Sequence, residues 1–383
     1  MHDEMTGIRR HLHQHPELSN EEKETAAFIC RKLDEYGISY KSGIAGTGVV
    51  GLIRGEQGDG PCLLLRADMD ALPVKEENKA DYVSCEEGVM HACGHDVHMT
   101  CLLGAARTLN LIKSSFRGTV KILFQPSEET YPGGAVRMIG EGVLHNPEVD
   151  MALGAHVFPE LKAGQAGFHP GPFMASTDEI HLTVKGKGGH AASPHLNVDP
   201  VLISAHILLA LQEIVSRNAN PLMPTVLSFG RIAGEGRTNI IPDEVRIDGT
   251  VRTFNEEWRK EIHRRVETIA TSIAAGMNGS CDVRIAHGYP FVYNNEALTD
   301  KLRRWAPEYL GEAQVVDLDR IMTAEDFSYF AQAVPSCFYR LGIRNEEKGI
   351  TSNLHSSTFD VDESALETGA GLMAWFACRL LNE

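Results

Sequence analysis

Residues 119–129 read TVKILFQPSEE and contain the strand that decides the fold class. The run 119–124 is apolar and rich in residues that favour strands, and Pro126 ends it. A short apolar run bounded by a turn signal predicts a buried strand. Two adjacent acids, Glu128 and Glu129, follow this strand. Because α/β folds place ligands at the carboxyl ends of their strands, both acids are candidates for binding or catalysis.

The segments on either side of this strand alternate between strand and helix patterns. Residues 48–54 and 62–66 are predicted to be buried strands, and residues 97–114 a long helix. Near the amino terminus, helices are predicted over residues 3–14 and from Asn20 to about residue 37. Helix and strand in alternation predict an α/β domain.

From residue 179 to about residue 290 the pattern changes to strand, helix, strand, strand, helix, strand, which is the order of a ferredoxin-like split βαβ unit. The α/β pattern then resumes to the carboxyl end. We therefore predict an inserted domain at residues 175–290, with residues 1–174 and 291–383 rejoining as one domain. The six inserted elements are predicted at residues 179–185, 200–217, 225–232, 244–253, 256–277 and 280–287.

Composition excludes several function classes. A length of 383 residues favours two domains. The formal net charge of −16 argues against nucleic acid as a partner. No apolar run approaches the roughly 20 residues that span a bilayer, and the first ten residues lack a signal-peptide core. These features predict a cytoplasmic protein with no membrane partner, whose eight cysteines are reduced.

Residues 90–98, MHACGHDVH, place a thiol and several imidazoles just before the predicted long helix. Cys thiolate and His nitrogen are ordinary ligands of Zn²⁺ and its neighbours in the transition series. Gly94 lets the backbone fold tightly enough for Cys93 and His95 to reach one ion. The alternative interpretation is a buried cysteine beside polar residues that cap the helix.

Glu128 and Glu129 have a comparable alternative, because a pair of adjacent acids is commonly a solvated turn. The buried strand before them favours a functional role. In an extended backbone, adjacent side chains point in opposite directions. One acid is therefore expected to bind a metal while the other meets the bound water as a general base.

Two single histidines extend the candidate metal site. His156 follows the apolar run 151–155, and His355 lies in the polar segment NLHS. Alone, each is more typical of a structural histidine. Together with Cys93 and His95 they give a ligand set in which two ions could share a bridging hydroxide.

Asp68 and Asp70 follow the predicted strand 62–66 in the segment RADMDALP. Both face the same side, because strand side chains alternate. A metal-bound imidazole normally needs a carboxylate to hold its other nitrogen. We predict that Asp70, or failing that Asp68, holds His95 in this way; the alternative is a turn made by Asp and Pro.

Six motifs occur in order along the chain. They are RRHLHQHPEL at residues 9–18, RADMDALP at 66–73, HACGHD at 91–96, QPSEE at 125–129, GGHAASP at 188–194 and TNIIP at 238–242. The set resembles the M20 metallopeptidases, and within them the amidohydrolase branch, which includes aminoacylases, hippurate hydrolases, N-acetyldiaminopimelate deacetylases and plant hydrolases of IAA conjugates. The resemblance covers nearly the whole chain.

The resemblance implies an α/β, zinc-aminopeptidase-like (phosphorylase/hydrolase-like) catalytic domain with an inserted ferredoxin-like α+β lid and dimerisation domain. It also implies two divalent metal ions per subunit. Zn²⁺, Mn²⁺, Co²⁺ and Ni²⁺ all accept mixed sulfur, nitrogen and oxygen ligands. The implied ligand set is Cys93 as the bridge, with His95, Glu129, His156 and His355.

The resemblance assigns further roles. Glu128 would be the general base, and His190 would reach the active site of the partner in a homodimer formed through the lid. Asn239 and Arg252 would bind the oxyanion side or the carboxylate of the substrate. The implied reaction is hydrolysis of an N-acyl amino acid, such as an N-acetyl or N-benzoyl derivative, to a carboxylic acid and a free amino acid. The alternatives are a dipeptidase or carboxypeptidase, and a metal-binding relative without catalytic activity.

Overall fold

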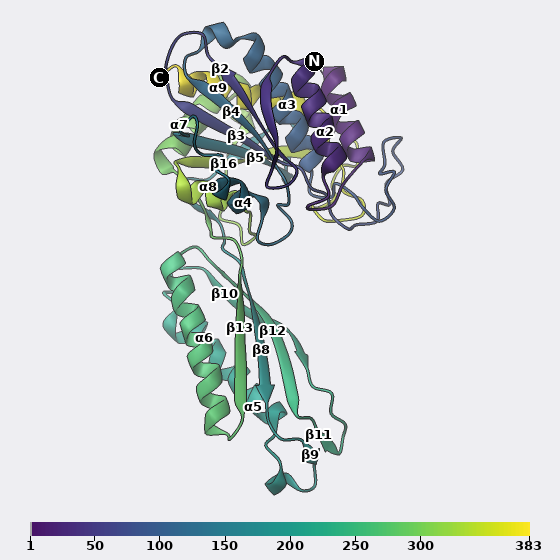
Figure 1. The fold of residues 1–383 in the computed structure, drawn as a ribbon, viewed down its shortest axis with the longest axis vertical. Coiled ribbons are helices and arrows are strands. Elements are labelled where there is room, and N and C mark those ends of the chain that lie inside the picture. The colour runs from purple at the N-terminus through teal and green to yellow at the C-terminus, as the bar shows by residue number, and fades with distance from the viewer. Residues whose placement is uncertain (1) are drawn as a thin grey trace. The chain divides into compact units, whose positions relative to one another are not determined.

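A computed structural model describes residues 2–383 and divides them into two compact units (Figure 1). Unit 1 contains the residues up to Gly171, Tyr293–Asp319 and Asp326–Glu383. Unit 2 contains Pro172–Val292 and Arg320–Glu325. The short segment Arg320–Glu325 joins unit 2 because the backbone N–H of Ala175 bonds to carbonyl oxygens within it.

The sheet of unit 1 has eight strands in the order β1-β2-β4-β3-β5-β16-β6-β15. Its centre is formed by β4 (Thr119–Gln125), β3 (Cys62–Asp68), β5 (Met151–Lys162) and β16 (Ser336–Arg344), and these strands run parallel to one another. Every residue of β3 is buried, so this strand is covered on both faces. The outer strands are β1 (Ser39–Ile44), β2 (Gly48–Arg54), β6 (Ala166–Phe168) and β15 (Val315–Asp317).

Helices complete unit 1, and α3 packs against both α9 and β3. One apolar core joins these helices to the central strands. Figure 1 shows α1, α2 and α3 beside one another. The helices are α1 (His2–Gln14), α2 (Lys23–Glu35), α3 (His95–Leu111), α4 (Gly134–Gly140), α7 (Glu296–Leu310), α8 (Ser328–Ala333) and α9 (Ala365–Leu381).

The start of α2 differs from the prediction. The helix begins at Lys23 rather than at Asn20, which has a left-handed φ of 70°. Glu22, expected in the first turn, is instead buried and accepts hydrogen bonds from the backbone N–H of Ser127 and from Thr47 Oγ1, each at 2.8 Å. Such contacts between distant segments leave no local signal in the sequence.

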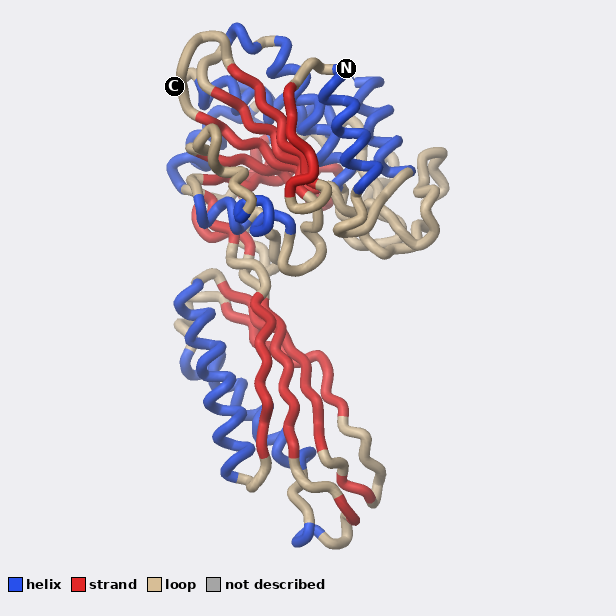
Figure 2. The backbone as a smooth tube through the Cα atoms, in the orientation of Figure 1, coloured by secondary structure: helices blue, strands red, loops and turns tan. Residues whose placement is uncertain are grey.

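Unit 2 has a four-stranded antiparallel sheet in the order β10-β12-β8-β13. Burial alternates along β8, and its inward residues Ile180, Leu182 and Val184 share a core with both helices. The helices therefore cover one face of the sheet (Figure 2). The predicted α/β fold class is confirmed, and the order of these elements is ferredoxin-like. The elements are β8 (Asp178–Lys185), α5 (Pro200–Glu213), β10 (Thr225–Ala233), β12 (Glu244–Thr253), α6 (Glu256–Gly276) and β13 (Ser280–His287), with a small pair β9 (Gly189–His190) and β11 (Ile240–Ile241). The short strands β7 (Gly171–Met174) and β14 (Val292–Asn294) each contain residues of both units.

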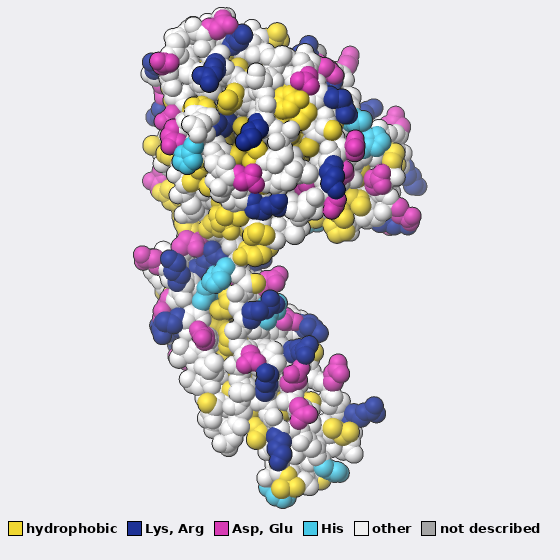
Figure 3. All heavy atoms as spheres, viewed as in Figure 1, with side chains coloured by type: hydrophobic (Ala, Val, Ile, Leu, Met, Phe, Trp, Pro, Cys, Tyr) yellow, Lys and Arg dark blue, Asp and Glu magenta, His cyan; other side chains and the backbone are white. Residues whose placement is uncertain are grey.

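Helix α5 carries an apolar surface on both sides. Together with the turn that follows, Pro200–Asn218 is long and apolar enough to cross a membrane by length and composition, a test that core helices also pass. Its inner side packs into the core of unit 2. Its outer side exposes Val201, Leu202 and Leu209, the last at 75 %. On the face drawn in Figure 3, basic and acidic side chains are interspersed.

Candidate metal centre

The predicted metal ligands of unit 1 meet at one edge of its sheet. Because β3, β4, β5 and β16 are parallel, their carboxyl ends lie together. Glu128 and Glu129 follow β4, and His355 lies in the loop after β16. His156 lies within β5, beyond Gly154, where the pairing of β5 with β3 ends.

Cys93 and His95 reach this edge through a tight turn at the start of α3. Gly94 between them has a φ of 78°, and a Cβ built there would lie 2.5 Å from the side chain of Val157. Glycine is therefore required by both its backbone angle and the close approach of β5. The turn places Cys93 Sγ 3.5 Å from His156 Nε2 and 3.3 Å from His355 Nε2.

The remaining predicted ligand, Glu129, completes the cluster. Its Oε1 lies 3.4 Å from His355 Nε2 and 3.9 Å from His95 Nε2. The ligand atoms fall into two groups, Cys93–His95–His156 and Cys93–Glu129–His355, each within 4.8 Å. Cys93 belongs to both groups. This is the arrangement that a bridging ligand requires.

The two adjacent acids do not point in opposite directions, contrary to the expectation for an extended backbone. Ser127 has a φ of 56°, and the backbone leaves the strand conformation before Glu128. Both carboxylates lie within 4.8 Å of a His95 nitrogen. The Asp70 carboxylate fixes this turn by accepting the backbone N–H groups of Glu128 and Glu129, at 3.0 and 2.9 Å.

Asp70 and Asp68 both flank His95, but on different nitrogens. Asp70 Oδ1 lies 3.4 Å from His95 Nδ1, and Asp68 Oδ2 lies 3.6 Å from Nε2. Asp68 also accepts hydrogen bonds from Arg66 and His98. Asp70 therefore faces the nitrogen that points away from Glu129, as its predicted role requires.

The cluster has unsatisfied groups that a cation would satisfy. Both nitrogens of His95 and Glu129 Oε1 are buried without a hydrogen-bond partner. Burial opposes a charged imidazolium, yet the carboxylates of Asp68, Asp70 and Glu129 outweigh it and raise the pKa of His95 to about 10. Burial, with Glu129 and Glu128, raises the pKa of Cys93 well above its usual value. This surplus of negative charge fits divalent cations, which favour the thiolate and the neutral imidazole.

His156 is already suited to bind a metal as a neutral imidazole. Its burial, with the positive charge of Arg340, holds the pKa of His156 well below its usual range. Its Nδ1 donates to the carbonyl oxygen of Val157 at 2.7 Å. The lone pair of Nε2 is then directed at the Cys93 side of the cluster.

The other predicted site residues belong to unit 2. His190 is exposed, and its Nδ1 accepts the backbone N–H of Ala192 at 3.0 Å, so a neutral ring presents Nε2–H as a donor. Asn239 lies beside it, because the Asn239 carbonyl accepts from Ala191 N at 3.1 Å. The strand β12 begins at Glu244, five residues after Asn239, and Arg252 lies near its other end. At roughly 3.3 Å per residue, Arg252 is about 26 Å from Glu244.

Two buried residues near the cluster were not assigned from the sequence. Asp326 accepts hydrogen bonds from Arg66 and Gln125, and its backbone N–H donates to Glu128 Oε1 at 3.3 Å. His98 contacts Asp68 and β5. His98 belongs to the histidine-rich segment 90–98, so the composition of that segment could have indicated a role for it. Asp326 is brought to Glu128 only by the fold.

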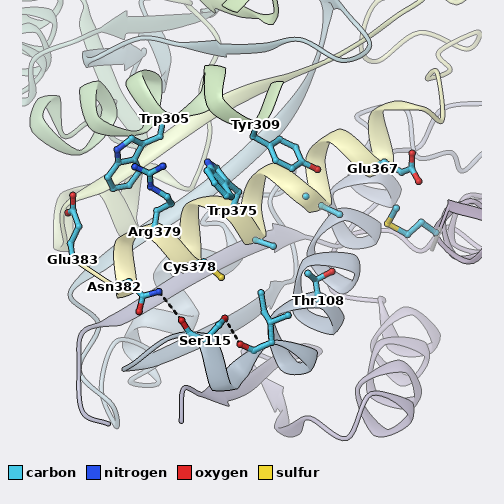
Figure 4. A pocket seen from close by; sticks show the side chains of 15 residues that line it. Thr108, Ser115, Trp305, Tyr309, Glu367, Trp375, Cys378, Arg379, Asn382 and Glu383 are labelled. Carbon is cyan, nitrogen blue, oxygen red and sulfur yellow. Dashed lines mark hydrogen bonds between the residues drawn. The ribbon is translucent and has the colours of Figure 1, made fainter. Parts of the chain in front are cut away.

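Unit 1 also has a hollow of about 1040 Å³ between α3, α7 and α9 (Figure 4). Trp305, Tyr309 and Trp375 line it. It lies at the carboxyl end of α3, about 25 Å from His95 at roughly 1.5 Å per residue. Among its charged residues, Arg379 is paired with Glu308 and Glu383 with Lys301, both outside the lining. The chemistry gathers at the metal-binding edge, so the hollow is not the candidate active site.

Comparison with known proteins agrees with this geometry. The sequence pattern of Peptidase family M20/M25/M40 matches residues 64–379. The N-acetyl-L-cysteine deacetylase of Bacillus subtilis is 40% identical over 379 residues, covering 99% of this chain and 88% of that protein. IAA-amino acid hydrolase ILR1-like 4 of Arabidopsis thaliana is 39% identical over 386 residues, covering 100% of this chain and 86% of that protein.

A solved structure extends the likeness to three dimensions. A dinuclear metal-binding peptidase of the M20 family from Bacillus subtilis superposes with a TM-score of 0.86 at 33% identity, covering 99% of this chain and 98% of the other. The predicted family resemblance is confirmed. The chain belongs to the peptidase family M20/M25/M40 and, within it, to the amidohydrolase branch of hydrolases that act on amide bonds.

Proposed function

We propose that this enzyme hydrolyses the amide bond of N-acyl amino acids, releasing a carboxylic acid and a free amino acid, with two divalent metal ions per subunit. The observation that carries the proposal is the cluster in which the buried Cys93 Sγ lies 3.5 Å from the buried His156 and 3.3 Å from His355, whose side chain is exposed. Glu128 lies beside this cluster.

In the proposed site, one ion would be held by the group of Cys93, His95 and His156. The other would be held by Cys93, Glu129 and His355. When bound, such ions polarise an acyl oxygen and lower the pKa of a water molecule. The similar solved structure that is described as dinuclear supports the count of two.

Glu128 is the proposed general base and acid. It is 7 % exposed, and the backbone N–H of Asp326 holds its Oε1. Glu128 takes a proton from the attacking water and later delivers it to the leaving nitrogen, so one carboxylate serves both halves of the reaction. A buried position protects this proton from exchange with bulk water.

The unit 2 residues support a homodimer as part of the proposal. His190 presents an N–H donor suited to a developing oxyanion, and Arg252 offers a fork suited to a carboxylate. His190 lies in the separate pair β9–β11, which follows the Lys185 end of β8, whereas Arg252 lies near the other end of the four-stranded sheet, so a single small substrate cannot touch both within one subunit. Two subunits would resolve this, and the exposed apolar side of α5 supplies a surface for pairing.

A second candidate activity is cleavage of a dipeptide or the carboxyl-terminal residue of a peptide. The description of the similar solved structure as a peptidase favours it. A dipeptidase would need an acid aimed at the free ammonium of its substrate. The acids near the cluster are engaged instead, since Asp68 bonds Arg66 and Asp70 bonds the backbone of the Glu128–Glu129 turn.

The test is release of free amine from matched substrates. N-acetyl-methionine, N-benzoyl-methionine, N-acetyl-methionine amide and alanyl-methionine are compared after chelation and after adding Mn²⁺, Co²⁺, Ni²⁺ or Zn²⁺. We expect metal-restored turnover of the first two and loss of turnover with the amide, which lacks the carboxylate. Turnover of alanyl-methionine alone would favour the peptidase. No turnover under any condition would contradict both activities.

A further inference from the structure

His98 occupies a gap in the sheet beside the metal cluster. The pairing of β3 with β5 ends at Arg66 and Gly154. Beyond that point the backbone N–H of Val157 has no strand partner on the β3 side and donates instead to His98 Nε2 at 2.9 Å. The other ring nitrogen, Nδ1, lies 2.6 Å from Asp68 Oδ1 at the end of β3. The imidazole thus bridges the two strands where their own hydrogen bonds stop.

The two contacts of His98 fix its protonation. Because Nε2 accepts the Val157 N–H, its lone pair is in use and it carries no proton. Nδ1 must then carry the proton that is shared with Asp68, whose carboxylate also accepts from Arg66 at 2.7 Å. The ring is neutral and has no lone pair left for a metal, although Asp68, His95 and His98 also fall within 4.8 Å of one another.

The position of this ring connects it to two proposed metal ligands. Its centroid lies 4.6 Å from that of His156 and 5.3 Å from that of His95. Val157, which His98 holds by its N–H, directly follows His156 and accepts the Nδ1–H of that residue through its carbonyl. His98 is 4 % exposed, so water cannot replace its contacts.

We propose that His98 is a positioning residue that ties Asp68 to the backbone after His156 and thereby sets the spacing of the metal ligands. The inference rests on the proposed function only in taking His95 and His156 as ligands. Groups that orient metal ligands typically change metal affinity by about 10–100-fold when they are lost. His98 acts through the backbone of β5 and through Asp68, and does not touch the metal or the substrate.

The test compares His98→Phe with His98→Gln in metal-stripped protein. Phe fills the same space without polar contacts, whereas the Gln amide offers one donor and one acceptor. Competition with a chelator gives the Co²⁺ and Zn²⁺ affinities, and the Co²⁺ spectrum reports the Cys93 environment. We expect His98→Phe to weaken at least one site by about 10–100-fold. His98→Gln is expected to retain most of the affinity.

One control variant and two contrary outcomes separate positioning from other roles. Leu102→Ala removes a buried side chain one turn along α3, so it lowers thermal stability but should leave metal affinity unchanged. Equal loss in His98→Phe and His98→Gln would make His98 a metal ligand and overturn the proposal. Unchanged affinity in His98→Phe would overturn it as well. If His98→Phe does not fold, His98→Asn takes its place, since it keeps the donor to Asp68 but is too short to reach Val157.

A readout without metal distinguishes this inference from the proposed function. Nitrogen-15 NMR of the metal-free protein should show His98 as the neutral tautomer protonated on Nδ1. The tautomer protonated on Nε2 would overturn the proposal, because that nitrogen could not accept the Val157 N–H. A wild-type protein that shows the expected tautomer but binds no metal would instead contradict the metal centre of the proposed function.

Discussion

The metal cluster of unit 1 and the predicted substrate-binding residues of unit 2 are built in opposite ways. In unit 1, His95 and Glu128 are buried, and Glu128 is held by hydrogen bonds with the distant residues Asp70 and Asp326. In unit 2, His190 is exposed on the two-residue strand β9, and Asn239 is exposed just before its partner strand β11. A site fixed by burial is already assembled within one unit. A site of exposed donors needs a further surface, supplied by substrate or by a second subunit, to complete it.

The first prediction tests the fixed region and has the largest expected effect. Glu128→Gln keeps the shape of the side chain but removes the proton acceptor. We expect kcat to fall by roughly 10²–10⁴-fold, with the metal content unchanged by elemental analysis. Glu129→Gln is the matched control. It should lower the metal content, and adding excess metal should restore part of its kcat. Full activity of Glu128→Gln would show that another group moves the proton.

The second prediction tests whether the exposed region acts across a dimer. Removing a donor to an oxyanion costs about 10²–10³ in kcat, so His190→Ala should lose that much while keeping its metals. Mixed dimers of Glu128→Gln and His190→Ala then provide the decisive measurement. If His190 serves the partner, each mixed dimer contains one intact site, and statistical mixing restores about one quarter of wild-type activity. No recovery would place His190 in its own subunit's site.

The two regions also differ in how far they could be predicted from sequence. Most of the cluster could be predicted, because four of its candidate ligands lie on or after apolar strands or beside a glycine that must be left-handed, as at Gly94, whereas the fifth, His355, lies in a loop. The convergence of Glu128 and Glu129 could not, because it depends on the φ of Ser127 and on Asp70, more than 50 residues away. The hydrogen bond from Asp326 to Glu128 is equally invisible locally.

The elements of the fold also divide into those with a local sequence pattern, which were predicted, and those set by distant contacts or too short for a pattern, which were not. The period-two burial of β8 and the fully buried β3 are local patterns, and both strands were predicted close to their observed bounds. The start of α2 was wrong, since Glu22 leaves the helix for buried contacts with Ser127 and Thr47. Short elements such as β6 and β15 were missed, because three residues carry no usable period.

The third prediction concerns Arg252, which contacts Thr250 Oγ1 and the Val251 carbonyl within unit 2. Lys keeps the charge but cannot donate two parallel hydrogen bonds to a carboxylate. We expect Arg252→Lys to raise KM about tenfold, or about 1.4 kcal/mol, with kcat and metal content nearly unchanged. The control substrate is N-acetyl-methionine amide, on which the variant and the wild type should be equally poor. A loss in kcat alone would argue against carboxylate binding.

The smallest predicted effect concerns Asp178, which anchors unit 2 itself. Its buried carboxylate accepts from Arg259 Nε and lies 2.7 Å from His263 Nε2. Burial alone would raise the pKa of Asp178, but Arg259 and His263 outweigh it and hold that pKa below its usual range. Since the folded pKa is the lower one, this stabilisation is complete above the unfolded value of about 3.9 and is lost as pH falls through the folded pKa.

Hydrogen exchange can measure the stabilisation by Asp178 in unit 2 alone. A separate measurement is needed because two units need not unfold together. Between pH 7 and pH 5, protection of the β8 and α6 amides should stay constant after correction for intrinsic exchange, and it should decline below about pH 4. Asp178→Asn should lower protection at pH 7 and flatten the decline, while the amides of β3 in unit 1 keep wild-type behaviour. An equal change in β3 would mean that the stability of the buried cluster depends on the unit that carries His190, and the contrast between the two regions would fail.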